Sequence, residues 1–462
     1  MTMAAAGISS GLAGIVGPAN VVADPVQLST YRIGEHVPKV AVQPGSDREV
    51  AETLRLAAAE KLALVPVGSR TKLGMNIPVR RYDLALDMAR LDRVVAYDPD
   101  DLTLSVEPGI PLHKLAGVLA EHRQFLPLAV PFLRRTTVGG TIASGVDSPL
   151  RQFYGTARDY VLGMEFVTGD GKIVKSGGRV VKNVSGYDLH KLMIGSLGSL
   201  GVITKVNFRT FPLPPSTRAF VAFFDSPLRA IEMRQRVAQS ALRPLTIEVL
   251  SPRAGELVSG SVASTIEPGQ MPEDALARGR WTFVASYAGT DKVVERYDQE
   301  LRRMAGVVDS VSLGEGAASV ALARVREFVA IALESSPATV VIKMSVVPAR
   351  LGELLDDAAS VAAKLELPFA AMARGVGVIY IALLPSARDE DSCSRAGSAV
   401  PNLRDICLRR EGNFAVLRWP AEWKRATPAH ETNRSDLELM RKLKNVFDPG
   451  AVFAPDPLAS WT

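Results

Sequence analysis

Three glycine-rich stretches stand close together in the first half of the chain: TVGGTIASG (137–145), YGTARDYVLGMEFVTGDGKIVKSGG (154–178) and KNVSGYDLHKLMIGSLGSLGVIT (182–204). The adjacent glycines of the first stretch permit a ligand to approach the backbone closely. An earlier stretch, GSRTKLG (68–74), follows an apolar run that predicts a strand, and its backbone donors and Lys72 suit a pyrophosphate. Each stretch alone is more typical of a turn. Only their coincidence points to a nucleotide site.

Two familiar nucleotide fingerprints are excluded by the residues themselves. Gly375-Val-Gly377 lies in a predicted strand and lacks the third glycine of a dinucleotide-binding turn. Residues 140–145 have the spacing of a phosphate-binding loop, but they continue with Val-Asp instead of Lys-Ser/Thr. Any nucleotide is therefore expected to be bound in another way.

Apolar periodicity predicts alternating helices and strands on both sides of these stretches. Helices are expected at 47–62, 111–123 and 188–194. Strands are expected at 62–68, 83–88, 92–97, 102–109, 161–168, 172–176 and 202–211. The cluster Pro212, Pro214 and Pro215 then predicts a domain boundary.

Beyond this boundary, strands are expected at 219–224, 282–287, 339–346, 377–384 and 413–419, and helices at 291–305, 350–366 and 434–446. This alternation predicts an α/β layer with helices on one face. The polar residues 386–402 predict a loop, and residues 1–23 predict a flexible tip followed by a short helix.

Composition places the chain among ordinary globular proteins and excludes several classes. Of 462 residues, 47% are apolar and 22% are charged, and the net charge of +5 is spread without a basic run, which argues against a nucleic-acid partner. Cys393 and Cys407 are the only cysteines, too few for an iron–sulfur cluster, and they suit a reducing compartment. Because no segment offers about 18 consecutive apolar residues, no membrane insertion is expected. The expected location is cytoplasmic, with membrane association only through partner subunits.

The wording, order and spacing of the three stretches resemble the FAD-binding domain of the vanillyl-alcohol oxidase / p-cresol methylhydroxylase (PCMH) type over residues 36–214. More closely, KNVSGYD (182–188) and KNVFDPG (444–450) resemble the family of the smaller FAD-binding subunit of bacterial glycolate oxidases, also called glycolate dehydrogenases. The resemblance implies an α+β fold, in which a two-subdomain PCMH-type FAD-binding domain precedes an α/β cap domain with an antiparallel sheet. We expect a lead segment at 1–35, the FAD-binding domain at 36–215, the cap or substrate-type domain at 216–420, and a segment at 421–462 that packs back on the FAD-binding domain.

The resemblance also assigns roles to individual residues. The 68–74 and 136–145 loops are expected to hold the FAD pyrophosphate, with the Pro108-Gly109 turn beside it. The backbone of Val202, Ile203 and Thr204 is expected on the adenine side, and Tyr187 and Asp188 toward the flavin ring. Two alternatives stay open, in which Asp188 caps a helix at 189–194 and Tyr187 packs in the core. The implied cofactor-binding residues are Gly68, Ser69, Arg70, Thr71, Lys72, Leu73, Pro108, Gly109, Thr136, Val138, Gly139, Gly140, Thr141, Ala143, Ser144, Gly186, Tyr187, Asp188, Val202 and Ile203.

Two departures from relatives concern attachment and catalysis. The first loop reads Ser69-Arg70-Thr71 where many relatives tether FAD through histidine, and neither cysteine lies in the flavin domain, so noncovalent FAD is expected. Catalytic relatives carry a late, glycine-rich histidine motif, whereas the late His430 lies in ATPAHET (426–432), which is typical of a solvated loop. Catalytic residues thus stay unassigned and no metal is expected. The candidate cations for a substrate carboxylate are Arg374, Arg418 and Lys424, although surface or partner-facing charges are the commoner interpretation.

These observations together predict an FAD-binding subunit of a glycolate oxidase-type complex that oxidises a small 2-hydroxy acid to a 2-oxo acid. The expected partners are a sister flavin subunit, which carries the main catalytic site, and an iron–sulfur subunit. Two alternatives stay open: a free-standing FAD-dependent D-lactate or 2-hydroxy-acid dehydrogenase, and a non-redox scaffold that keeps the FAD fold for assembly.

Overall fold

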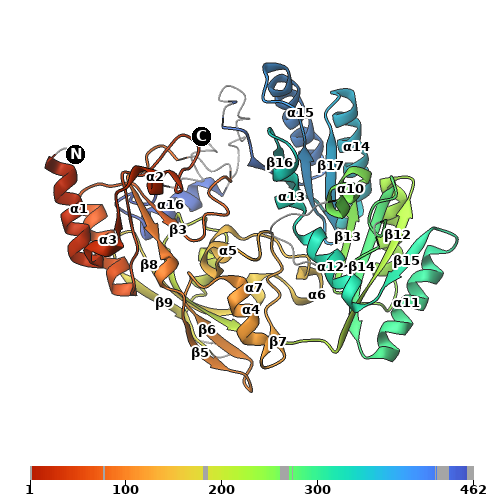
Figure 1. Ribbon diagram of the computed structural model, residues 1–462, viewed down its shortest axis with the longest axis horizontal. Helices are drawn as coiled ribbons and strands as arrows, with labels where there is room; N and C mark the ends of the chain where they lie inside the picture. The colour runs from red at the N-terminus through yellow and green to blue at the C-terminus, as the bar shows by residue number, and fades with distance from the viewer. Residues whose placement is uncertain are drawn as a thin grey trace.

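The computed structural model describes residues 3–75, 79–179, 186–260, 270–272, 274–421, 423 and 436–454. Two groups of sheets lie side by side (Figure 1). We call residues 3–212 with 436–454 the N-terminal half, and residues 216–418 the C-terminal half. The change from one to the other falls between strands β11 (Phe211–Pro212) and β12 (Ser216–Phe224).

The first sheet of the N-terminal half has the strand order β1-β2-β4-β3. Strands β2, β4 and β3 run parallel, whereas β1 pairs antiparallel with β2. Helix α3 connects β2 to β3, and the side chain of its N-cap residue, Ser46, accepts a hydrogen bond from the backbone of Glu49. Helix α1, in the segment expected to begin as a flexible tip, packs against α3 through the buried Leu12. The elements are α1 (Met3–Val16), β1 (Val21–Val22), α2 (Pro25–Ser29), β2 (Val40–Val42), α3 (Asp47–Ala59), β3 (Leu64–Val67) and β4 (Leu84–Asp87).

The second sheet is antiparallel throughout, with the order β5-β6-β10-β8-β9. Helices α4 and α5 pack against it around a core that includes Leu115, Ile142, Phe166 and Phe208. Residues 136–145, expected as a loop, contain helix α5 because Thr137 caps the run Val138–Ser144. The elements are β5 (Val94–Asp98), β6 (Thr103–Val106), α4 (Leu112–Ala120), β7 (Gln124–Phe125), α5 (Val138–Ser144), α6 (Arg151–Tyr154), α7 (Ala157–Tyr160), β8 (Val161–Val167), β9 (Ile173–Gly177), α8 (His190–Met193) and β10 (Val202–Arg209).

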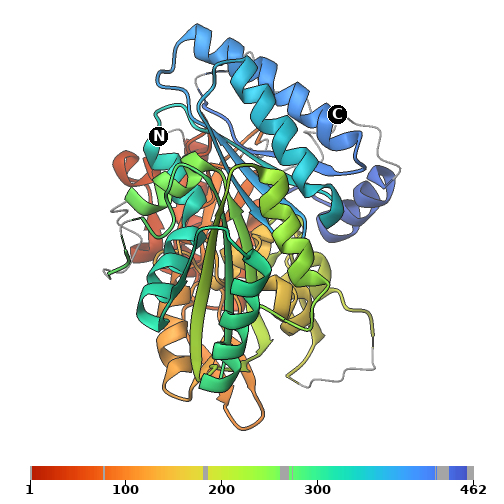
Figure 2. The ribbon, with the colours of Figure 1, turned by 90° about the vertical axis from the view of Figure 1, so that its right-hand side faces the viewer.

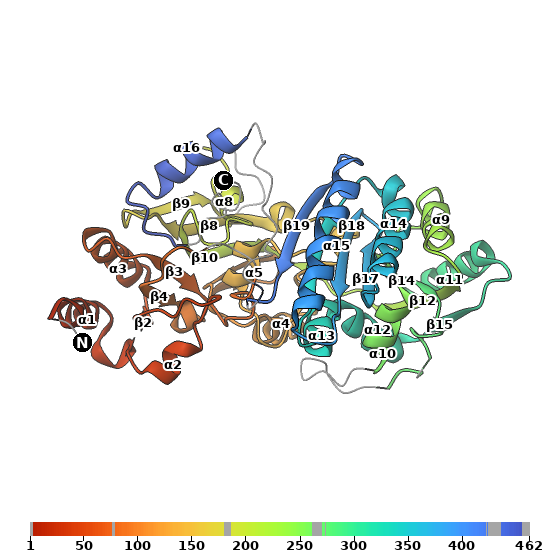
Figure 3. The same ribbon diagram turned by 90° about the horizontal axis from the view of Figure 1, so that it is seen from above.

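The C-terminal half is built on one eight-stranded sheet, in which all neighbouring strands are antiparallel. Its order is β15-β12-β14-β13-β17-β18-β16-β19. Figure 2 looks onto this half, and Figure 3 shows it beside the N-terminal half. The strands are β12, β13 (Thr246–Leu250), β14 (Trp281–Gly289), β15 (Ser310–Leu313), β16 (Val340–Ser345), β17 (Phe369–Arg374), β18 (Val378–Leu383) and β19 (Asn413–Arg418).

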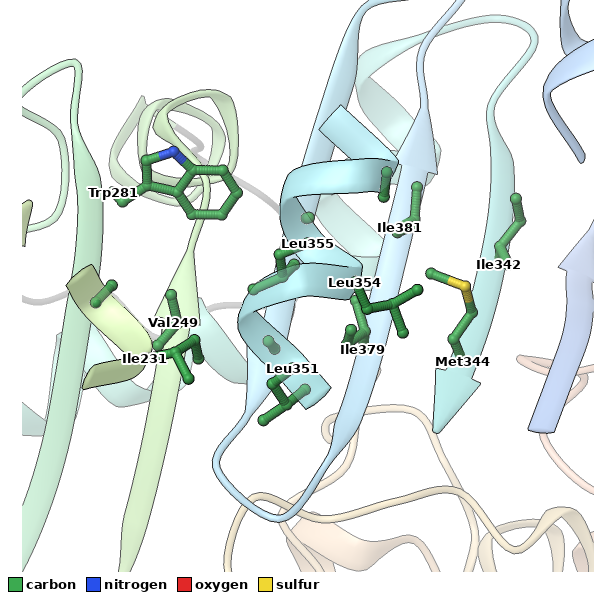
Figure 4. Packing of buried hydrophobic residues seen from close by; sticks show 14 of the residues in the cluster. Ile231, Val249, Trp281, Ile342, Met344, Leu351, Leu354, Leu355, Ile379 and Ile381 are labelled. Carbon is green, nitrogen blue, oxygen red and sulfur yellow. The ribbon is translucent and has the colours of Figure 1, made fainter. Parts of the chain in front are cut away.

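Helices cover both faces of this sheet, so the prediction of helices on one face is wrong. Central strands such as β13 and β18 are buried at every position, which gives each face an apolar surface to cover. Figure 4 shows Leu351 and Leu354 of α14 packed near Ile379 of β18. One face carries α9 (Pro227–Ala238), α11 (Asp291–Ala305), α14 (Leu351–Lys364) and α15 (Glu390–Leu408), and the other carries α10 (Pro252–Gly260), α12 (Glu315–Arg326) and α13 (Phe328–Ser335).

Helix α15 replaces the polar loop that the sequence predicted at 386–402. Asp389 caps it by accepting a hydrogen bond from the backbone of Ser392. Small residues and a few aliphatic ones then recur on one helical face and are buried: Ala396, Ala399, Val400, Leu403, Ile406 and Cys407. Because alanine and serine are only weakly apolar, their helical periodicity was hidden in the composition of the segment.

The end of the described chain packs on the N-terminal half. Helix α16 (Leu437–Phe447) buries Phe447 in the core of the second sheet, and the backbone of Gly169 donates to the Phe447 carbonyl. Lys444 pairs with Asp448 at 2.6 Å and donates to the Ser199 carbonyl at 2.8 Å. None of the described helices combines the length and the apolar character needed to cross a membrane.

Candidate functional site

A narrow cleft crosses the N-terminal half between the two sheets. One wall is the segment after β3, another is helix α5, and a third is the turn that precedes β10. Its lining residues are Ile33, Val65–Leu73, Met75, Val79, Met88, Pro108, Thr137, Gly139, Gly140, Ala143, Ser144, Leu197, Gly198 and Gly201–Ile203.

Glycines allow the walls of this cleft to approach one another. A Cβ on Gly68 would lie 2.4 Å from Thr137 Oγ1, and one on Gly139 would lie 2.5 Å from Pro108 Cβ. Gly198 has φ of +73°, a conformation that other residues rarely adopt. The cleft is thus long, lined by backbone and small residues, and bordered by Arg70 and Lys72, a combination that fits an extended ligand with an anionic centre such as FAD.

Most of the residues assigned to FAD by resemblance line this cleft. They are Gly68, Ser69, Arg70, Thr71, Lys72, Leu73, Pro108, Gly139, Gly140, Ala143, Ser144, Val202 and Ile203. Four others stand behind the lining. Val138 is buried in the core of the second sheet, Thr136 and Thr141 share a buried hydroxyl contact of 3.3 Å, and Gly109 packs against the backbone of Met88.

Gly186, Tyr187 and Asp188 lie elsewhere and do not line the cleft. The Tyr187 side chain is 90% exposed, so it is not packed in the core. Asp188 pairs with Lys191 at 2.7 Å, and Leu189 stands at the N-cap of α8 without a side-chain cap. The structure therefore does not bring these residues toward a flavin ring in the cleft. Residues 182–185 of the same motif lie outside the described residues.

The cleft meets a second, wider cavity of about 580 Å³ between the two halves. Thr71, Lys72, Met75 and Ser144 line both spaces. The far wall of the cavity is formed by strands β16, β18 and β19 together with the end of helix α13. A cavity of this size is typical of small-molecule sites.

Cationic side chains predominate in this cavity. Lys72, Lys343, Arg388 and Arg418 line it, and among the described lining residues the exposed Glu334 brings the one carboxylate. Burial lowers the pKa of Lys72 to about 8 and also lowers the pKa of Lys343. Arg418 Nη1 donates to the Gly74 carbonyl at 3.2 Å, which links β19 to the loop after β3.

Lys343 and Tyr380 face each other across β16 and β18 and present an ammonium group and a phenol to the cavity. Lys343 Nζ lies 5.9 Å from the centre of the Tyr380 ring. Within the residues that the structure describes, Lys343 forms no ion pair. The pair offers a cation and a hydroxyl to an anionic, oxygen-rich ligand.

A buried ionic cluster supports the cavity from behind and joins the two halves. Arg374 of β17 pairs with Glu248 of β13 at 3.1 Å and with Asp147, which follows α5, at 2.7 Å. Asp147 also pairs with Arg151 at 2.7 Å. Burial raises the pKa of Glu248 to about 7, an effect that the neighbouring Arg374 opposes.

Sequence reasoning placed Arg374 and Arg418 as candidate cations but missed Asp147, Glu248, Lys343 and Tyr380. Arg374 is only 3% exposed and already paired, so it is not a surface charge. The sequence could have pointed to Lys343 and Glu248, because each is a charged residue inside an apolar strand: Lys343 in VVIKMS and Glu248 in TIEVL. His430 and Lys424 lie outside the described residues, within which no cluster of His, Cys, Asp and Glu suited to a metal occurs.

Comparisons with known proteins agree with this geometry. An FAD binding domain model matches residues 38–177, and a model of the C-terminal domain of FAD linked oxidases matches residues 213–414. The chain is 18% identical to p-cresol methylhydroxylase, with a TM-score of 0.77 over 98% of this chain and 97% of that one, so the fold is of the PCMH type.

Among curated relatives, glycolate oxidase subunit GlcD of Bacillus subtilis is 23% identical over 91% of this chain and 89% of its own length. Subunit GlcE of Escherichia coli is 35% identical over 43% of this chain and 55% of its own length. The D-2-hydroxyglutarate dehydrogenase of Xanthomonas citri pv. viticola is 28% identical over 91% of this chain and 89% of its own length.

Proposed function

We propose that this chain, an FAD-dependent oxidoreductase that joins an FAD binding domain to an FAD-linked oxidase C-terminal domain, is an FAD-binding subunit of a glycolate oxidase-type complex that oxidises a 2-hydroxy acid to a 2-oxo acid. Relatives named as glycolate oxidase subunits and as D-2-hydroxyglutarate or D-lactate dehydrogenases support this substrate class.

One observation carries the proposal: the FAD cleft meets a cation-lined cavity at Lys72 and Ser144. A 2-hydroxy acid has a carboxylate next to the carbon that is oxidised. Lys343 would bind that carboxylate, and the Tyr380 hydroxyl, which accepts a hydrogen bond from Arg374, would donate to the hydroxyl oxygen of the acid. The ligand would then lie where the cavity meets the FAD cleft.

FAD bound in the cleft supplies a two-electron acceptor for the hydrogen on C2 of the acid. In that oxidation the C2–H bond would break with its electron pair as a hydride, which the acceptor would take up. The hydroxyl proton would pass to water, and the C–O single bond would become the carbonyl of the 2-oxo acid. The chain itself would orient the acid through Lys343, which lines the cavity between its halves.

We further propose that a sister flavin subunit carries the main catalytic site and that an iron–sulfur subunit takes the electrons onward. Two cysteines cannot hold a four-thiolate cluster, so that role needs another chain. The chain also lacks the late glycine-rich histidine motif that its family resemblance implies for catalytic relatives. A positioned base contributes about 10² to 10⁴ in rate.

Co-purification from the native source, followed by anaerobic mixing with glycolate or D-lactate, tests the proposal. We expect partner subunits to co-purify, and we expect bound FAD to be reduced by a 2-hydroxy acid at least about a hundredfold faster in the complex than in the isolated chain. Failure of every 2-hydroxy acid to reduce the complex would overturn the substrate class.

A free-standing 2-hydroxy-acid dehydrogenase is the second candidate, because the match to D-2-hydroxyglutarate dehydrogenase spans 91% of this chain. If a 2-hydroxy acid rapidly reduces the FAD of the isolated chain and no partner is recovered, the free-standing dehydrogenase is favoured. A colourless protein that does not take up FAD would instead select the scaffold.

A further inference from the structure

Lys72 lies where the FAD cleft meets the cavity, because its side chain lines both. Its neighbour in the loop, Arg70, lines only the cleft and stacks over the Tyr31 ring at 4.6 Å. The two cations of this loop therefore address different ends of a ligand that extends along the cleft. Because it also lines the cavity, Lys72 is placed toward the end at which substrate and cofactor would meet, whereas the sequence alone had suggested that it binds the pyrophosphate.

The ammonium group of Lys72 has only hydroxyl partners among the described residues. Its Nζ donates to Thr136 Oγ1 at 2.5 Å and more weakly to Thr71 Oγ1 at 3.4 Å. The carboxylate of Glu327 raises the pKa of Lys72 electrostatically, but it already has other partners. Glu327 accepts hydrogen bonds from the backbones of Phe132 and Leu133 at 2.7 and 3.3 Å and pairs with Arg326 at 3.2 Å.

Lys72 is partly buried and forms no direct ion pair among the described residues, so a ligand that brings negative charge to it is favoured. We propose that Lys72 balances the negative charge that the FAD ring gains on reduction, and so raises the midpoint potential of the bound cofactor. The inference rests on the FAD-dependent function, but it requires neither a particular substrate nor a partner subunit.

The pKa of Lys72 in this protein is about 8. When the pH of the solution exceeds this value, reduction of FAD should cause Lys72 to take up a proton. Below that pH, reduction takes up two electrons and one proton. The ratio of reduced to oxidised FAD at a fixed potential then changes tenfold per pH unit, so the midpoint potential falls by about 30 mV per pH unit. Above that pH, Lys72 takes up a second proton on reduction. The ratio of reduced to oxidised FAD then changes about a hundredfold per pH unit, and the midpoint potential should fall by about 60 mV per pH unit. The other ionisable groups in or near the two linings are Arg70, Glu327, Glu334, Lys343, Tyr380, Arg388 and Arg418.

The test measures the midpoint potential of FAD in the purified chain by reduction against a reference dye, without substrate. In Lys72→Met, we expect the preference for reduced over oxidised FAD to fall at least tenfold, a potential lower by about 30 mV. Lys72→Arg should retain most of the potential. Arg70→Gln is the matched control, because it removes a cation of the same loop and should weaken both oxidation states equally.

Three outcomes would overturn the inference. One is a potential in Lys72→Met that equals that of the unmodified chain while FAD affinity falls equally in both states, which would assign Lys72 to the pyrophosphate. Another is no change in potential or affinity. The third outcome uses the unmodified chain and applies even if Lys72→Met binds no FAD. A midpoint potential that still falls by only about 30 mV per pH unit up to pH 10 would contradict the inference. Because no 2-hydroxy acid is used, the proposed substrate class can fail independently.

Discussion

Replacing Arg374 with methionine tests whether the buried ionic cluster holds the two halves together. Asp147 would keep its ion pair with Arg151, but Glu248, which is 1% exposed, would lose its charged partner. Removing one partner of a buried ion pair costs about 3–5 kcal/mol of unfolding free energy. We expect Arg374→Met to lose an amount in this range at pH 8.

The unfolding free energy lost in Arg374→Met should depend on pH. The folded-state pKa of Glu248, about 7, lies above its ordinary value, so its contribution to stability is present at low pH and is lost as the pH rises through about 7. Without Arg374 that pKa rises further. The destabilisation should therefore be smaller at pH 6 than at pH 8, and Arg374→Met/Glu248→Gln should recover part of the loss at pH 8.

Urea unfolding followed by tryptophan fluorescence measures this change, because Trp281 of the C-terminal half and Trp419 and Trp423, which follow it, pack in the same apolar core. Arg296→Met is the matched control, since the exposed pair of Arg296 with Glu300 should contribute only about 0.2–1 kcal/mol. A loss for Arg374→Met no larger than this control, or a loss that grows toward pH 6, would refute the reasoning.

Three further predictions concern the ligands. Acid or heat denaturation should release all of the flavin into the supernatant, and flavin that stays with the precipitated chain would contradict noncovalent binding. Gly140→Val should abolish FAD retention in a folded chain, because even a Cβ at this position would lie 3.1 Å from Thr137 Oγ1 and would obstruct the cleft; a yellow variant with an unchanged melting temperature would separate this residue from the cofactor. Lys343→Gln should weaken the binding of oxalate, followed by the flavin absorbance, by about tenfold or more, since a hydrogen bond to a charged group is worth about 1.5–3 kcal/mol. The exposed Lys364→Gln serves as its control and should bind oxalate as the unmodified chain does.

Local pattern in the sequence was sufficient for much of the N-terminal half. The strands around 64–67, 161–167 and 202–209 and the helix at 47–59 are confirmed, because apolar periodicity and flanking glycines specify them within a few residues. The glycine-rich stretches by themselves indicated only a site of close backbone approach. Their resemblance to the PCMH-type FAD-binding domain is what predicted FAD as the ligand.

The cavity depended on the tertiary structure. Lys72 and Lys343 come from separate halves and line one cavity only because the halves pack together. The same packing brings Asp147 against Arg374 and Glu248 in a buried ionic cluster. Sequence spacing carries no information about such contacts, just as the composition of residues 386–402 concealed a helix whose small residues are buried by a neighbouring sheet. A charged side chain within a strand is visible in the sequence, but the groups that surround it, and so its pKa and its function, are decided by residues far away along the chain.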